Sequence, residues 1–329
     1  MPSDSLNRPA DPPVESAPPQ GGGRPVALAV DFGGTKVESA LVDDAGRVLS
    51  ASRFRAPTGK NSSSEQLVDS VTTVVRQSLS ALPADRQLVG IGIGAAGPID
   101  RERGLVSPVN LTVWRDFALR DTVESTARES GHDASAVLRL DGLCITLAES
   151  WVGAGSGRMN MMGMIVSTGV GGGVISGGSV VSGLSGNAGH IGQVEVPGFT
   201  EPDAPCTLEE IASGPHTVAW ARARGFEGTT GEDLALAYAA GDHIAVAAVT
   251  RSGTAIGRAI ASVSTLLDLE VVVIGGGFSL VSPDLFDIIR NAIDRYARFD
   301  YARRVEVLPT GLGADGPLVG AAALVFRGV

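Results

Sequence analysis

The pattern of apolar and polar positions predicts alternating strands and helices from about residue 26 onward. Two apolar segments, 26–32 and 37–42, flank a short glycine turn, as the strands of a hairpin would. A helix is predicted over 64–82, because apolar residues repeat there at helical spacing. The apolar segment 88–93 then returns as a strand, which makes the parallel crossover of an α/β layer.

Cap and turn residues set the ends of several elements. A capping box at Ser63 and Gln66 opens the first helix, and Ser282 opens a later one with Pro283 at the first helical position. Residues 43–46 form a hairpin turn. The remaining elements are predicted as helices near 116–130, from about 208, at 243–267 and at 316–323, and as strands at 136–140, 270–274 and 304–308.

Two glycine-rich turns share one design. Asp31-Phe-Gly-Gly-Thr-Lys36 follows the first strand, and Ser167-Thr-Gly-Val-Gly-Gly-Gly173 lies between two later apolar segments. Adjacent glycines let the backbone approach a bulky ligand, while threonine hydroxyls and main-chain N–H groups donate to phosphate oxygens. The first turn alone is also compatible with an ordinary hairpin. Its second copy predicts two phosphate clamps in two related halves.

A third glycine-rich segment is not interpreted as a nucleotide site. Gly92-Ile-Gly-Ala-Ala-Gly97 matches the dinucleotide fingerprint formally. That fingerprint requires a helix to begin at the turn, whereas residues 98–104 have no apolar helical face. We therefore predict a loop here.

Composition limits the class of protein. At 329 residues and 43% hydrophobic, with a mean hydropathy of +0.19, the chain is long and apolar enough for two cores. The net charge of −10 argues against a nucleic-acid partner. Two cysteines, Cys144 and Cys206, are too few for a disulfide framework, which favours a reducing cytoplasm. No segment approaches the roughly 20 apolar residues of a membrane span, and no signal peptide is evident.

The order of these motifs resembles the ROK family of sugar kinases and repressors, from about Val26 to the C-terminus. The segments that carry the resemblance are Asp31–Lys36, Asn110-Leu111, Asp141, Ser167–Gly173, Ala188-Gly-His-Ile-Gly192 and Leu208-Glu-Glu-Ile-Ala-Ser-Gly214. The resemblance implies an α/β protein of two actin-like (ribonuclease H-like) domains, with nucleotide and sugar meeting in the cleft between them. It also implies that the terminal helix packs back toward the first domain.

The domain limits follow from composition and from the resemblance together. Residues 1–25 are rich in proline and glycine and are expected to be disordered. The N-terminal domain spans 26–140 and the C-terminal domain 141–329. Repressors of the family carry an N-terminal helix-turn-helix domain, for which the tail offers no amphipathic helix pair, so the kinase branch is favoured.

The resemblance implies roles for the motif residues. Asp141 is the general base for the attacked hydroxyl, although on sequence alone it also suits a helix N-cap. Asp31 holds Mg²⁺ through water, and Lys36 either reaches phosphate or is merely solvated. The phosphates of ATP contact Gly33, Gly34, Thr35, Thr168, Gly169 and Gly171, and adenosine is bordered by Gly275 and Gly276.

The expected sugar-binding residues are Asn110, His190, Gln193 and Glu209, together with Asp141. Each also has an ordinary interpretation, such as a turn-forming asparagine or a carboxylate placed at a helix start. Family glucokinases read Ala-Gly-Glu-x-Gly-His, whereas this chain has His190 and Gln193. The histidine resembles bacterial N-acylmannosamine kinases. Loss of the second histidine, with Cys206 alone where three cysteines are expected, removes the family's structural zinc.

We therefore expect a homodimeric, cytoplasmic, ATP- and Mg²⁺-dependent kinase acting on the primary hydroxyl of a hexose. Glucose follows from the family, and His190 favours N-acylmannosamine or N-acetylglucosamine as the alternative substrate. A third possibility is a regulator that binds sugar without transferring phosphate. Leu140-Asp-Gly-Leu143 would suit it, because the family usually writes Asn-Asp-Ala-Asn there.

Overall fold

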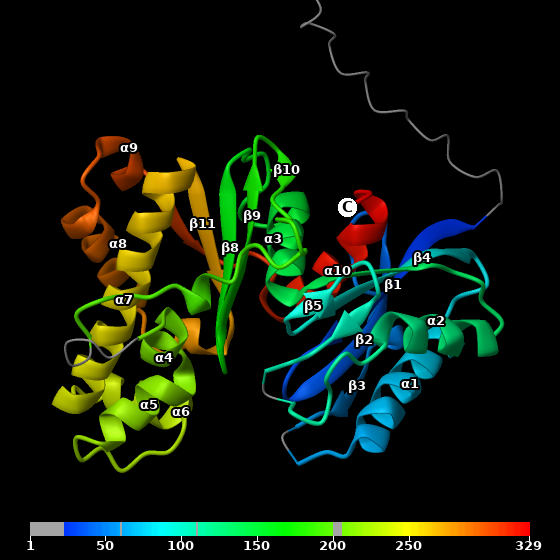
Figure 1. The fold of residues 1–329 in the computed structure, drawn as a ribbon, viewed down its shortest axis with the longest axis horizontal. Helices are drawn as coiled ribbons and strands as arrows, with labels where there is room; N and C mark the ends of the chain where they lie inside the picture. The colour runs from blue at the N-terminus through cyan, green and yellow to red at the C-terminus, as the bar shows by residue number, and fades with distance from the viewer. Residues whose placement is uncertain (1–22, 60, 110, 200–205) are drawn as a thin grey trace, which may run out of the picture.

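The computed structural model describes residues 23–59, 61–109, 111–199 and 206–329. Two lobes lie side by side, each built on one mixed sheet (Figure 1). The predicted tail falls almost wholly outside the described residues. Its last two residues, Arg24 and Pro25, already belong to the first strand, so the first lobe begins two residues earlier than predicted.

The sheets of the two lobes have the same strand order. The first sheet contains β1 (Arg24–Phe32), β2 (Lys36–Asp43), β3 (Phe54–Pro57), β4 (Arg86–Ala95) and β7 (Ala136–Leu140), in the order β3-β2-β1-β4-β7. The second contains β8 (Met161–Val166), β9 (Val170–Ser176), β10 (Ser179–Val180), β11 (Val271–Gly275) and β12 (Glu306–Pro309), in the order β10-β9-β8-β11-β12. Each begins with an antiparallel meander and adds two parallel strands, as two related halves require.

Helices cover the outer faces of both sheets (Figure 1). The first lobe carries α1 (Ser64–Ser80) and α2 (Leu119–Glu129), and the predicted capping box opens α1. The second lobe carries α4 (Leu208–Ala212), α5 (Gly214–Arg222), α6 (Gly231–Ala239), α7 (His243–Leu267), α8 (Leu285–Tyr296) and α9 (Asp300–Arg303). No helix in the described ranges has the length and apolarity needed to cross a membrane.

Two inner helices join the lobes. The helix α3 (Asp141–Val152) packs on β8 and β9, and α10 (Gly316–Phe326) packs on β1 and β4 of the first sheet. The two helices also pack on each other, at a spacing only glycine allows, because a methyl group on Gly320 would lie 1.9 Å from the carbonyl oxygen of Cys144. The C-terminal helix therefore belongs to the core of the first lobe.

Several predicted element ends differ from the structure, and three of the differences have a local cause. The helix α8 begins at Leu285 instead of Pro283, because the Ser282 hydroxyl accepts a bond from Asp284 N at 3.0 Å and forms a turn. The helix α2 starts after Asp116, whose φ of 51° is left-handed. The strand β12 begins at Glu306, because α9 occupies the residues just before it.

The segment after β4 forms a small hairpin instead of a helix. Its strands are β5 (Ile99–Asp100) and β6 (Leu105–Val106). This agrees with rejecting the dinucleotide fingerprint, although the hairpin itself was not predicted.

Candidate active site

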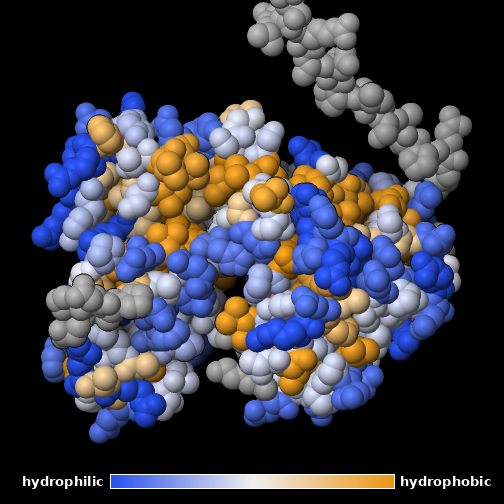
Figure 2. Space-filling view, viewed as in Figure 1, coloured by the Kyte–Doolittle hydropathy of each residue, from blue (hydrophilic) through white to orange (hydrophobic). Residues whose placement is uncertain are grey.

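Two aspartates lie at the ends of two strands of the first sheet that flank the same central strand. Asp31 lies near the end of β1, and Asp141 directly follows β7, with β4 pairing to both strands. Burial, followed by the charge of Asp141 and opposed by Lys36, raises the pKa of Asp31 to about 7. The effect of Asp141 on Asp31 places the two carboxyl groups within electrostatic reach of each other. Figure 2 shows a hollow between the two lobes on this face of the molecule.

Asp141 is the first residue of α3, and it is not the helix N-cap. Leu140 occupies that position, while Asp141 Oδ1 accepts the N–H of Gly142 at 2.7 Å. Burial raises the pKa of Asp141 to about 6, against the opposing effects of this hydrogen bond and of nearby His190. The carboxyl group is thus held in one orientation with an affinity for protons unusually high for aspartate.

The unusual residues around Asp141 are explained by packing. Leu140 and Leu143 are 3% and 2% exposed and belong to the apolar core. A methyl group on Gly142 would lie 2.6 Å from the backbone of Gly172, so α3 can meet β9 only with glycine there. Leu140, Gly142 and Leu143 therefore pack so that they hold Asp141 in place, although the family pattern has other residues next to the aspartate.

His190 lies against the loop that follows β4. Its Nδ1 is 2.8 Å from the carbonyl oxygen of Asn187. A carbonyl oxygen only accepts, so Nδ1 carries a proton and Nε2 of the neutral ring is an acceptor. A methyl group on Gly97 would lie 3.3 Å from Nε2, so this edge of the ring faces Gly97. His190 therefore lines the same space as Asp141.

Glu209 and Gln193 meet at the second glycine turn. Glu209 Oε2 accepts the N–H of Val170 at 2.8 Å, and its Oε1 accepts from Gln193 Nε2 at 3.4 Å. The charge of Glu209 also raises the pKa of Asp141, as a smaller effect. The structure thus brings together four of the five predicted sugar residues. Asn110 lies outside the described residues.

The first glycine turn has hydrogen-bond donors that the described residues do not use. Gly33 N donates to the carbonyl of Lys36 at 2.9 Å, and Thr58 Oγ1 donates to the carbonyl of Gly33 at 2.8 Å. The N–H groups of Gly34 and Thr35 make no hydrogen bond within the described part of the chain. These two amides and the exposed Thr35 hydroxyl are therefore the donors that remain for a ligand.

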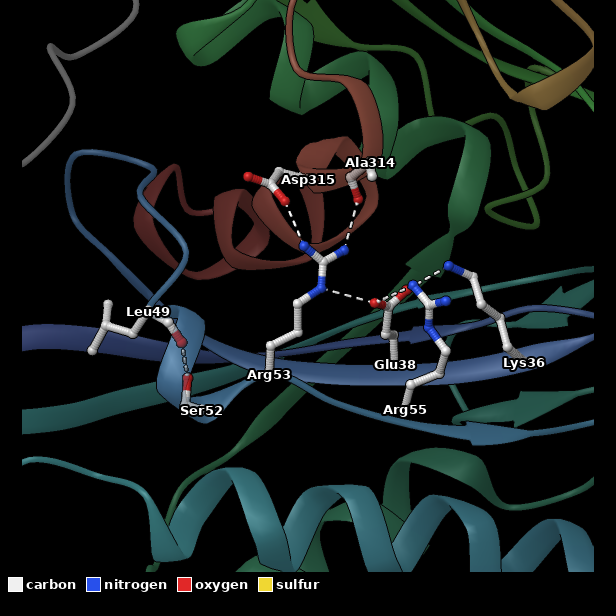
Figure 3. Close-up of polar contacts among 8 residues, drawn as sticks. All are labelled: Lys36, Glu38, Leu49, Ser52, Arg53, Arg55, Ala314 and Asp315. Carbon is white, nitrogen blue, oxygen red and sulfur yellow. Dashed lines mark hydrogen bonds and ion pairs between the residues drawn. The ribbon is translucent and has the colours of Figure 1, made fainter.

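Lys36 takes part in a network around Glu38 that the sequence did not reveal (Figure 3). Glu38, whose side chain is 3% exposed, accepts from Lys36 Nζ at 2.5 Å, from Arg53 Nε at 2.8 Å and from Arg55 Nη2 at 2.9 Å. Although burial opposes it, this bonding lowers the pKa of Glu38 to about 2. The one available signal was a single carboxylate in the apolar strand 37–42.

The same network reaches the C-terminal helix. Arg53 Nη1 lies 2.6 Å from Asp315 Oδ1, and Nη2 donates to the carbonyl of Ala314 at 3.1 Å (Figure 3). Both partners directly precede α10. The arginine thus ties β2, through Glu38, to the segment that leads into α10.

The other predicted nucleotide residues lie around the second turn and at the end of β11. Ser167 N donates to the carbonyl of Gly169 at 2.9 Å, Thr168 is exposed, and Gly171 lies in β9. Gly275 ends β11. Gly276 has a φ of 96°, and a methyl group on it would lie 2.5 Å from the carbonyl oxygen of Val166 in β8. Thr168, Gly169, Gly275 and Gly276 therefore lie at one end of the second sheet.

Metal ligands are sparse. No group of three or more histidine, cysteine, aspartate or glutamate side chains suited to an ion occurs in residues 23–59, 61–109, 111–199 and 206–329. Asp31 could therefore bind a cation only together with water and ligand oxygens.

Comparisons with known proteins agree with this arrangement. The ROK family profile matches residues 27–327. A glucokinase from Halalkalibacterium halodurans is 30% identical over 320 residues, covering 91% of this chain and 94% of the relative. An N-acetylmannosamine kinase from Yersinia pseudotuberculosis is 31% identical over 265 residues, covering 77% and 83%. The crystal structure of a ROK family glucokinase from Streptomyces griseus with glucose and AMPPNP has a TM-score of 0.77 at 28% identity, covering 92% of this chain and 99% of that one.

The fold is thus the two-domain actin-like fold of sugar kinases, as predicted. The chain belongs to the ROK family. The domain limits and the roles of individual residues remain predictions.

Proposed function

We propose that the protein phosphorylates the primary hydroxyl group of a hexose with ATP. The observation that carries this proposal is the position of Asp141, oriented by Gly142 and facing His190 and Asp31 between two glycine turns. The similar proteins include glucokinases, one of them solved with glucose and AMPPNP. Glucose is therefore the first substrate to test.

Asp141 would act as the general base. The hydroxyl oxygen of the sugar forms a bond to the γ-phosphorus as the bond to the β-phosphate oxygen breaks, and ADP leaves. Asp141 accepts the hydroxyl proton. Because burial raises its pKa to about 6, this carboxylate is a better proton acceptor than an ordinary aspartate and is still ionised at neutral pH.

The first turn would hold the transferring end of ATP. Gly34 and Thr35 offer N–H groups, and Asp31 offers a carboxylate for Mg²⁺ through water. A hard cation fits the carboxylate oxygens of Asp31, which are buried beside a turn whose N–H groups can bind phosphate oxygens. Bound Mg²⁺ neutralises charge that develops on the phosphoryl oxygens. Lys36 reaches the phosphates only if it leaves Glu38.

A sugar panel with ADP release tests the proposal. Glucose, mannose, N-acetylglucosamine and N-acetylmannosamine are each compared in the wild type and in Asp141→Asn, with sugar binding followed by calorimetry. ADP release that requires a sugar and Asp141 supports a kinase. Binding without ADP release supports the sugar-sensing regulator instead.

An N-acylated amino sugar is the second candidate substrate. The acceptor Nε2 of His190 can receive the N–H of an acylamino group, which glucose lacks. The similarity to an N-acetylmannosamine kinase points the same way. The same sugar panel decides between the two.

We also propose a homodimer in the cytoplasm. Tyr296 and Phe299 are 37% and 56% exposed beside a groove of about 290 Å³ that Arg258 also lines. Exposed aromatic and arginine side chains are enriched at protein interfaces. Light scattering should give twice the chain mass, and Phe299→Glu should reduce it.

The fold should form without zinc. The guanidinium groups of Arg251 and Arg258 lie 5.7 and 5.3 Å from the ring centre of Phe199, and these contacts fix Phe199 without a metal. Metal analysis finding one zinc per chain, or unfolding by a chelator, would contradict this.

A further inference from the structure

Asn187 connects the two lobes directly beside the site. It lies in the loop between β10 and the short 3₁₀ turn Ile191–Gln193 of the second lobe. Its side-chain Oδ1 accepts the N–H of Ile99 at 3.0 Å, and its Nδ2 donates to the carbonyl of Ile99 at 2.8 Å. The side chain thus pairs with β5 of the first lobe as a peptide group of another strand would.

The main chain of the same residue holds His190. The carbonyl of Asn187 accepts the proton on Nδ1 at 2.8 Å, and this bond sets which ring nitrogen is left as an acceptor. Ile99 follows two residues after Gly97, the residue that Nε2 faces. One asparagine therefore fixes both the imidazole and the loop segment opposite it.

Only an amide suits this position. Aspartate keeps the acceptor for Ile99 N but loses the donor to its carbonyl, and alanine loses both bonds. Nδ2 also reaches Ser185, at 3.3 Å to its carbonyl and 3.2 Å to its hydroxyl, which limits how the amide can rotate. Ile99 itself is 5% exposed, so its backbone groups are shielded from water that could replace these bonds.

We propose that Asn187 is a positioning residue for sugar recognition: its side-chain amide, bonded to Ile99, fixes the place of the backbone carbonyl that bonds His190 Nδ1, and so sets the position of the imidazole relative to residues 97–99. This inference rests on the proposed function of His190 in the sugar wall. A residue that only stabilised the loop would affect all sugars equally and would act independently of His190.

A double-mutant cycle separates these two roles. Asn187→Ala, His190→Ala and the double variant are compared in kcat/KM for glucose and N-acetylmannosamine, and in sugar Kd by calorimetry without ATP. Asn187→Ala should lower kcat/KM for the preferred sugar by about tenfold or more, since small misplacements of binding groups have effects of this order. The same substitution should have less than about a twofold effect when His190 is already alanine. The kcat/KM of Asn187→Asp should lie between those of the wild type and Asn187→Ala, because aspartate keeps one of the two bonds to Ile99.

Asn160→Ala is the matched control. Its side chain also fixes a loop, accepting the N–H of Gly177 at 2.9 Å, but this loop lies at the other end of β8 and β9. The control should leave sugar selectivity unchanged. Additive effects of the Asn187 and His190 substitutions, or an equal change in selectivity in the control, would overturn the inference. A wild type that binds sugar without releasing ADP contradicts the kinase proposal alone, because the binding cycle still decides the role of Asn187.

Discussion

The two glycine turns have the same backbone design but different charge around them. Both join antiparallel strands at the centre of sheets with the same strand order. The first turn has Asp31 before it and the Glu38 network behind it. The second is held by Glu209, which bonds a main-chain N–H and a neutral glutamine. The repeated fold therefore supplies the backbone donors twice, whereas the charged groups around the two turns differ.

The charge around the first turn suits a phosphate ligand. Lys36, Arg53 and Arg55 bond the carboxylates of Glu38 and Asp315, and the charges of Lys36 and Arg53 also lower the pKa of Asp31. Cations beside the turn can balance part of the charge of a polyphosphate. The contrast predicts that Asp31 and the charges around the first turn act mainly on phosphoryl transfer, whereas His190 and Glu209 near the second turn act mainly on sugar choice.

Asp141→Asn should have the largest effect. Loss of a general base typically lowers kcat by about 10²–10⁴-fold, because the amide cannot accept the hydroxyl proton. Sugar binding should persist, since asparagine has nearly the same shape. Turnover measured by ADP release, with calorimetry for sugar binding, checks both parts. A variant that keeps most of its turnover would remove Asp141 from the mechanism.

The Glu38 network should matter for stability much more than the second turn does. Glu38→Ala leaves three cations without their shared carboxylate and should cost about 2 kcal/mol, less than the 3–5 of fully buried pairs because the partners are partly exposed. Glu209→Gln keeps an acceptor for Val170 N and should cost under about 1 kcal/mol. Urea unfolding compares the two. Equal losses would mean that the turns do not differ in this respect.

The sequence predicted the individual strands and helices more fully than the contacts between them. Periodicity placed α7 at its observed ends, and the repeated turn indicated two related halves. The Glu38 network was missed because its members come from β2, β3 and the segment before α10, which only the folded chain brings together. Asn187 was missed for the same reason, since its partner Ile99 is far away in sequence.

His190→Glu should change selectivity by a smaller factor. A carboxylate accepts from two hydroxyl groups of an unmodified hexose, whereas neutral His190 offers one acceptor. The ratio of kcat/KM for glucose to that for N-acetylmannosamine should rise by about tenfold, within the range seen when one hydrogen-bonding partner is changed. His190→Gln, which retains a neutral acceptor, is the control. A wild type that strongly prefers glucose, with an unchanged ratio in the variant, would exclude His190 from the sugar wall.

Asp31→Asn should stabilise the protein while impairing it as an enzyme. Burial and the charge of Asp141 raise the pKa of Asp31 to about 7 from an ordinary 3.8, so the folded state holds this proton to higher pH than the unfolded state. Between those values the unfolded chain is ionised and the folded chain is not. Stability therefore falls as pH rises through this window, and the full cost is present above it.

Asparagine cannot ionise and avoids that cost. The variant should match the wild type in urea unfolding at pH 4 and exceed it by about 1 kcal/mol at pH 8, a modest gain because bound water reduces such penalties. Asp44→Asn, at an exposed turn position, should show no such pH dependence. The variant should also need more Mg²⁺ for turnover. A stability difference that stays constant from pH 4 to pH 8 would show that Asp31 is ordinary in its ionisation, and the contrast between the two turns would then lose its electrostatic basis.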